Sequence, residues 1–117
     1  MFAKKIIRSI GYSLDGLRYA YRHDLSFRME TWGSIAFFLF GYLLWPLTSI
    51  EFLFLTLSLL LIFITELINT AFERSLERLH PQRHELIGMS KDIASSAVLL
   101  AFIFAIIVAL TILFRRF

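Results

Sequence analysis

The chain has 117 residues, of which 58% are hydrophobic and 13 are Phe, a composition more apolar than a soluble domain of this length needs. Twelve Lys and Arg residues against nine Asp and Glu residues give a net charge of +3, so cations are available to meet anionic lipid headgroups. The absence of Cys excludes disulfides and thiolate metal sites.

Residues 1–28 are predicted to form an amphipathic helix that lies on the membrane surface. Apolar residues recur at every fourth position through Phe2, Ile6, Ile10 and Leu14, with cations between them. These cations exclude a cleavable signal peptide, because they leave no uninterrupted apolar core. A cytosolic helix packed on protein is the alternative.

Three further segments, residues 31–49, 51–78 and 87–114, are predicted to cross the bilayer. The apolar part of the second is short, but its helical pattern continues beyond the membrane surface. Nothing divides the chain, so we expect an all-α membrane protein with one domain, 1–117.

The basic residues predict the orientation of these spans. Ten of the twelve lie in residues 1–30 and 74–91, which three spans place on the same side. The positive-inside rule assigns that side, and therefore the N-terminus, to the cytoplasm. Trp45 and Pro46 mark a turn on the opposite side.

A polar stripe enters the second predicted span. Glu66, Asn69, Glu73 and Glu77 fall within an arc of about 80° on a helix. A carboxylate at the depth of Glu66 is costly unless it is paired, protonated or hydrated, so it indicates a functional site. The alternatives are a polar contact between helices for Glu66 and Asn69, and a solvated end paired with Arg residues for Glu73 and Glu77.

A second group of polar residues opens the third predicted span. Lys91 and Ser95 lie one turn apart, and Lys is a natural partner of phosphate. Several neighbours are small, which favours helix packing as the role of most of them. His80 and His84 have the spacing of a metal pair, but exposed interfacial histidines are the favoured interpretation.

Asp24 and Glu30 stand where the surface helix meets the first span. Carboxylate oxygens from separate helices suit Mg²⁺, which commonly bridges protein carboxylates and substrate phosphates. A helix cap, or an ion pair with Arg22 or Arg28, explains these residues equally well. The sequence has no glycine-rich phosphate loop and no soluble-kinase signature, so any active site must be built from helix faces.

Three segments together resemble the prokaryotic integral membrane diacylglycerol kinases. They are GYSLDGLRYAYRHDLSFRME (11–30), ELINTAFE (66–73) and HELIGMSKDIASSAVLLA (84–101). The resemblance implies a homotrimer in the bacterial inner membrane, with composite sites between neighbouring subunits at the cytoplasmic surface. It also implies ATP- and Mg²⁺-dependent, in-line phosphorylation of diacylglycerol to phosphatidic acid, and we expect no nucleic-acid partner.

The resemblance also assigns roles to residues. It implies that Glu66 is the catalytic base, and that Asp24 and Glu73 bind the metal. The implied ATP-binding residues are Lys5, Tyr12, Asp24, Asn69, Glu73, Gln82, Arg83, His84, Lys91 and Asp92. The implied lipid-substrate residues are Glu30, Glu66 and Ser95. Asp24, Glu77 and Lys5 replace the Glu, Asp and Arg expected there, and each keeps its charge.

Other functions compete with this interpretation. Undecaprenol is the acceptor in a sister branch of the family, and the HEL at 84–86 favours diacylglycerol over it. A small ion-coupled transporter would use Glu66 and Asn69 to line a pathway. A non-catalytic assembly subunit would use the small residues for packing alone.

Overall fold

The computed structural model describes residues 1–43, 46–82 and 84–116, which form four helices and no strand. This confirms the all-α class. Arg83, an expected ATP contact, and Trp45, expected at a turn, lie outside the described residues. The helices, in chain order, are α1 (Phe2–His23), α2 (Leu25–Leu43), α3 (Ser49–Leu79) and α4 (Glu85–Arg116).

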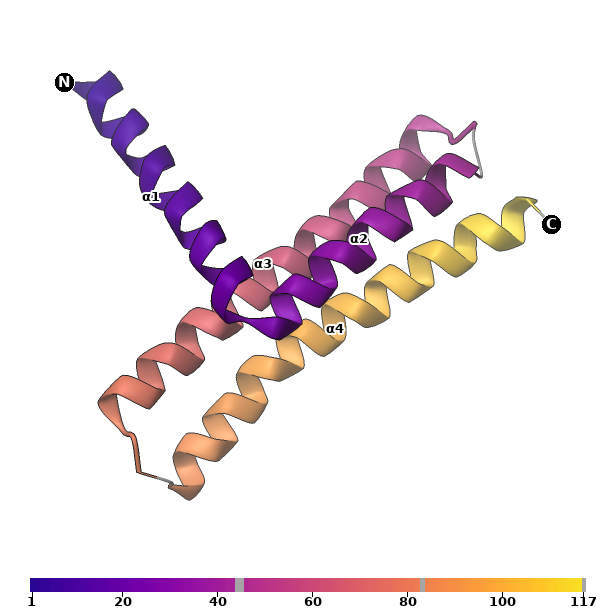
Figure 1. Ribbon diagram of the computed structural model, residues 1–117. Helices are drawn as coiled ribbons and strands as arrows, with labels where there is room; N and C mark the ends of the chain where they lie inside the picture. Colours follow the sequence, from indigo (N-terminus) through magenta and orange to yellow (C-terminus); the bar gives the residue numbers. More distant parts are fainter. Residues whose placement is uncertain (44–45, 83, 117) are drawn as a thin grey trace.

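α3 and α4 form a long antiparallel hairpin that is the framework of the molecule (Figure 1). The buried residues of α4 recur at alternating spacings of three and four, which is the seam expected where two helices pack along their length. They are Val98, Ala101, Ala105, Val108 and Ile112. The small Ala side chains in this seam allow the two helices to approach closely.

α2 lies along α3 over one half of the hairpin only (Figure 1). Phe27 at its start meets Phe63 edge-on, with 5.7 Å between the ring centroids. Near its other end, a Cβ on Gly41 would stand 2.9 Å from Leu55 Cδ2, so the missing side chain lets α2 approach α3. The other half of the hairpin, with the α3–α4 connection, extends past α2.

The chain bends sharply between α1 and α2 at Asp24, which has extended backbone angles (φ −119°, ψ 108°). Its carboxylate oxygen Oδ1 accepts a hydrogen bond from Ser26 N at 3.0 Å, and its carbonyl accepts one from Arg28 N at 3.1 Å. Asp24 therefore caps the start of α2. The Arg28 side chain turns back to donate to Arg22 O at 3.1 Å, which satisfies a carbonyl at the end of α1.

This bend moves the predicted boundaries. The surface helix ends at His23 rather than at residue 28, and the following helix is Leu25–Leu43 rather than residues 31–49. The reason is local, because a side-chain cap at Asp24 starts α2 before its apolar run begins. α3 and α4 extend one or two residues beyond each end of the predicted ranges 51–78 and 87–114.

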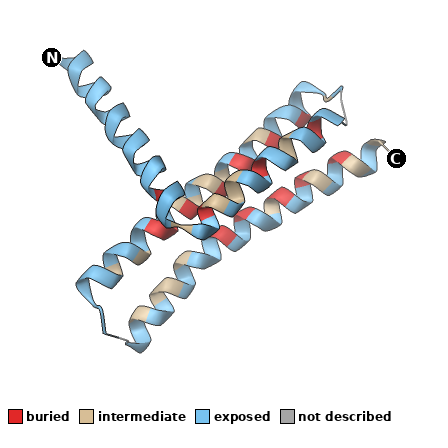
Figure 2. Cartoon of the chain, in the orientation of Figure 1, coloured by how far each residue is buried: buried red, intermediate tan, exposed pale blue. Residues whose placement is uncertain are grey.

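Most of the apolar surface is left uncovered by the chain itself (Figure 2). α3 and α4 are long and apolar enough to cross a membrane, and only 33% and 28% of the residues in their apolar stretches are buried within the chain. Over its described residues α2 does not qualify as a span by the same measure. Every residue of α1 except Ala20 is exposed, and α1 projects away from the hairpin. Exposing so large an apolar area to water is unfavourable in free energy, so lipid or other subunits must cover it.

Candidate functional site

Four carboxylates from three parts of the fold meet beside α3. Asp24 comes from the bend, Glu30 from α2, and Glu66 and Glu73 from α3. Glu66 is close enough to interact electrostatically with the other three. We call these four residues the acidic cluster. The structure thus brings together, within one chain, the predicted base and both predicted metal ligands.

Two α3 residues of this site are nearly inaccessible to solvent, with 5% of Glu66 and 8% of Asn69 exposed. Asn69 Nδ2 donates to Glu73 Oε1 at 3.4 Å, one helical turn away. Among the described residues, Asn69 Oδ1 and Glu30 Oε2 are buried without a donor, and the Glu30 carboxyl lies against that of Glu66. Buried polar atoms are normally paired, so the Asn69 oxygen is available to a ligand or an ion.

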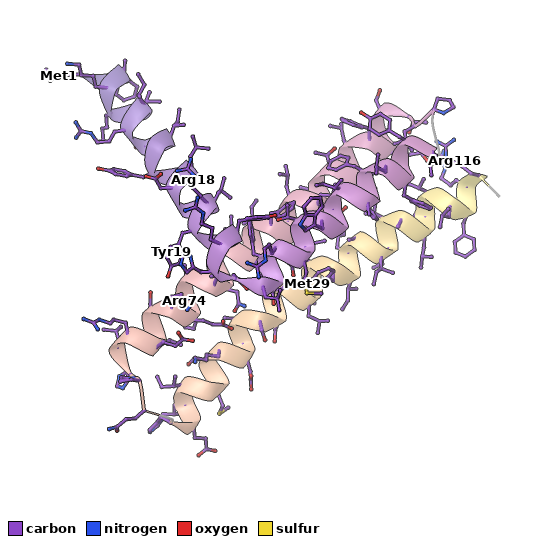
Figure 3. The ribbon with its side chains drawn as sticks, in the orientation of Figure 1. Met1, Arg18, Tyr19, Met29, Arg74 and Arg116 are labelled. Atoms are coloured by element: carbon purple, nitrogen blue, oxygen red, sulfur yellow. The ribbon has the colours of Figure 1, made fainter. Side chains whose placement is uncertain are left out.

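Two further α3 residues hold the bend against the cluster. Thr70 Oγ1 donates a hydrogen bond to Asp24 Oδ2, and Arg74 Nη2 donates to His23 O at 2.9 Å. Figure 3 shows Arg74 at the foot of α1. Sequence reasoning missed both contacts. The available signal was position, because Thr70 lies one turn after Glu66 and so shares its helix face.

Within the described part of the chain, no Lys or Arg pairs with the acidic cluster. The nearby cations go to Glu77, which lies 3.8 Å from Arg74 and 4.0 Å from Lys91. The sequence left open that Glu73 and Glu77 are ion-paired residues at a solvated helix end. The structure supports this for Glu77 but not for Glu73. The helix-cap alternative describes Asp24, whose carboxylate nevertheless also faces Glu66.

The donor set of the cluster fits a hard divalent cation. Its oxygens are the ligands Mg²⁺ prefers, and in the described ranges no Lys or Arg ion pair occupies them. No group of three or more His, Asp or Glu side chains in those ranges is placed to hold a metal ion together. Mg²⁺ commonly uses one or two carboxylates and completes its shell with water and substrate phosphates, so a pair of ligands suffices. His80 and His84 form no such group either.

A polar cleft of about 790 Å³ opens where α3 ends and α4 begins. Its lining includes four of the predicted ATP-binding residues, Gln82, His84, Lys91 and Asp92. Lys91 reaches across it toward Glu77. Ser95 lies one turn beyond Lys91, exposed, with its hydroxyl bonded to Asp92 O of the same helix at 2.9 Å.

An apolar groove of about 320 Å³ runs between α2, α3 and α4 on the other side of the cluster. Glu30 lines it together with Gly33, Ser34, Ile62 and Phe102 and other apolar residues. Along α3 the three features follow one another. Ile62 lies in the groove one turn before Glu66, and Glu77 lies in the cleft one turn after Glu73.

The structure does not bring Lys5 or Tyr12 to the cluster. Both are exposed on the outer part of α1, which projects away from the other helices (Figure 1). Within one chain, the site therefore lacks the two predicted ATP contacts on α1.

Comparison with known proteins finds related sequences along nearly the whole chain. Residues 11–113 match the family described as prokaryotic diacylglycerol kinase. The chain is 35% identical over 114 residues to a diacylglycerol kinase of Escherichia coli, covering 97% of this chain and 92% of the relative. It is 36% identical over 96 residues to one of Haemophilus influenzae, covering 82% and 80% respectively. It is 32% identical over 98 residues to one of Pseudomonas aeruginosa, covering 84% and 79%.

Proposed function

The chain belongs to the prokaryotic diacylglycerol kinase family, and we propose that it transfers the γ-phosphoryl group of ATP to the hydroxyl of diacylglycerol, giving phosphatidic acid. The observation that carries this proposal is the order of features along α3. A groove for an apolar chain, a set of carboxylates and a polar cleft follow one another within a few helical turns. A kinase acting on a lipid needs these three environments side by side.

We place the reaction at the cytoplasmic surface of the bacterial inner membrane. In this arrangement α2, α3 and α4 cross the bilayer and α1 lies on its surface with the N-terminus in the cytoplasm. The exposed apolar surfaces of the helices and the basic residues at one end of the hairpin support it. The acyl chains then stay in the membrane while the hydroxyl reaches the headgroup region.

The lipid would enter through the apolar groove. An acyl chain between α2 and α4 would contact mainly hydrocarbon, and Glu30, which lines the groove, lies beside Glu66. Glu30 and Glu66 would thus face the glycerol end of the lipid. Ser95, exposed on α4, would contact the same headgroup.

The nucleotide would occupy the polar cleft, where the Lys91 ammonium offers charge to phosphate oxygens and Gln82, His84 and Asp92 offer polar contacts. Asp24 and Glu73 would hold Mg²⁺, which neutralises charge on the phosphates when bound. Asn69 holds Glu73 by its hydrogen bond and leaves its own oxygen free for a ligand.

Glu66 would take the proton from the lipid hydroxyl as its oxygen forms the new bond to the γ-phosphorus. The bond from that phosphorus to the β–γ bridging oxygen breaks in line, and ADP leaves with the electron pair. No phosphoenzyme is required. Because such transfer depends on positioning and charge neutralisation, helix faces are a sufficient scaffold.

Lys5 and Tyr12 would meet the nucleotide of a neighbouring subunit. They are exposed and distant from the cluster of their own chain, so a ring of identical subunits would supply them to adjacent sites. We therefore propose a homotrimer with composite sites.

The test is transfer of labelled γ-phosphate from ATP and Mg²⁺ to diacylglycerol or undecaprenol, each dispersed equally in mixed micelles. We expect labelled phosphatidic acid from the unmutated protein and none from Glu66→Gln. Asp15→Asn is a matched control, since it neutralises an exposed carboxylate paired with Arg18 on α1. Full activity of Glu66→Gln would refute its role as base, and labelled undecaprenyl phosphate would move the protein to the sister branch. If the folded protein phosphorylates neither lipid, the transporter hypothesis would be favoured instead.

A further inference from the structure

Asp24 performs two tasks that compete for one short side chain. It is the cap that starts α2, through Ser26 N, and it belongs to the acidic cluster. The cap uses Oδ1 of the carboxylate, so the other oxygen, Oδ2, is left for a second hydrogen-bond donor. That oxygen accepts the hydrogen bond from Thr70 on α3.

The direction of the Thr70 hydroxyl is unusual for this protein. In apolar helices a Thr hydroxyl ordinarily donates to a carbonyl three or four residues earlier in the same helix. Thr65 does so, to Leu61 O at 2.8 Å and Ile62 O at 3.1 Å, and Thr111 does so, to Ile107 O at 2.7 Å. Thr70, only 9% exposed, instead donates to a carboxylate from a different segment.

The contact leaves Asp24 able to bind a further partner. An ionised carboxylate has about four acceptor positions, and Ser26 N and Thr70 occupy two of them. Metal-binding carboxylates are typically held in this way by a hydrogen-bond donor that does not itself touch the metal.

From this geometry we infer that Thr70 is a positioning residue, which holds the Asp24 carboxylate in the acidic cluster beside Glu66, where that carboxylate would serve the divalent cation. The inference deepens the proposed function and rests on its assignment of Asp24 and Glu73 as the cation ligands. Arg74 secures the backbone of the bend through His23 O, whereas Thr70 acts on the ligand itself.

The experiment measures cation binding directly, independently of catalysis. Mn²⁺ is titrated into the full-length detergent-solubilised protein with a non-hydrolysable ATP analogue, and bound Mn²⁺ is followed by electron paramagnetic resonance. Thr70→Val removes the hydroxyl with little change of shape, and Thr70→Ser retains it. Thr65→Val is the matched control, since it removes a hydroxyl of the same helix that bonds only its own backbone.

We expect Thr70→Val to weaken Mn²⁺ binding by about 10- to 100-fold, while Thr70→Ser and Thr65→Val stay within about twofold of the unmutated protein. Binding by Thr70→Val equal to that of the unmutated protein would overturn the inference. So would equal losses in Thr70→Val and Thr65→Val, or failure of Thr70→Ser to preserve binding. Because lipid phosphorylation is not the readout, a failed kinase assay and a failed role for Thr70 are separate results.

Discussion

Arg116 Nη2 lies 2.9 Å from Glu51 Oε1 and joins the last turn of α4 to the first turn of α3. The same nitrogen donates to Pro46 O at 2.6 Å, and Figure 3 shows Arg116 at this end of the hairpin. Glu51 is 7% exposed and also forms a capping box with Thr48. At the end of the hairpin remote from the acidic cluster, the Arg116 guanidinium therefore links the end of α4 to the start of α3.

Arg116→Met is expected to destabilise the protein by about 1.5 kcal/mol, because it removes a charge-assisted hydrogen bond from a Glu51 carboxylate that the capping box with Thr48 still holds. Thermal unfolding in detergent measures the loss. Arg115→Met is the comparison, since Arg115 is exposed and acts on Glu51 only through its charge, without an ion pair among the residues that the structure describes. Equal melting temperatures for the two variants would show that the Glu51 pair contributes nothing.

Lys91→Met is expected to raise the KM for ATP by about 10- to 100-fold, because a charge-assisted contact to phosphate contributes about 1.5–3 kcal/mol. Steady-state kinetics at saturating diacylglycerol measures it. Arg78→Met removes a cation from the last turn of α3 that does not line the cleft, and should change KM less than twofold. A rise of similar size in both variants would indicate general electrostatic attraction instead of a contact at Lys91.

Gly33→Leu is expected to raise the KM for long-chain diacylglycerol roughly tenfold, since the new side chain would occupy groove volume otherwise open to an acyl chain. The KM for ATP should not change, and diacylglycerol with short acyl chains should be affected less. Gly11→Leu adds the same side chain on α1, where a Cβ also meets nothing within 4 Å. An unchanged lipid KM in Gly33→Leu would argue against the groove as the acyl-chain site.

Co-assembly of two inactive chains tests the composite site. One carries Glu66→Gln, and the other carries Lys5→Met with Tyr12→Ala. If each site combines the cluster of one chain with α1 of its neighbour, random equal mixing makes about a quarter of the sites intact. Activity should rise to about that share after unfolding and reassembly together, and not after simple mixing. A site built within one chain would give no rise.

Much of the architecture follows from the sequence by itself. Apolar length and helical periodicity predict the long helices, because an amphipathic or apolar run of that length has few other ways to satisfy its backbone. The polar stripe through Glu66, Asn69 and Glu73 also follows from spacing on one helix. The family membership, stated first from the segments at 11–30, 66–73 and 84–101, is confirmed by the comparisons.

Only the tertiary structure decided where the chain bends and what meets at the bend. The cap at Asp24 depends on one side chain satisfying the start of α2, and hydropathy does not register such a contact. Contacts of Thr70 with Asp24, and of Arg116 with Glu51, join residues 46 and 65 positions apart. Long-range pairs of this kind are set by how helices pack, and the periodicity of a single helix carries no information about its neighbour.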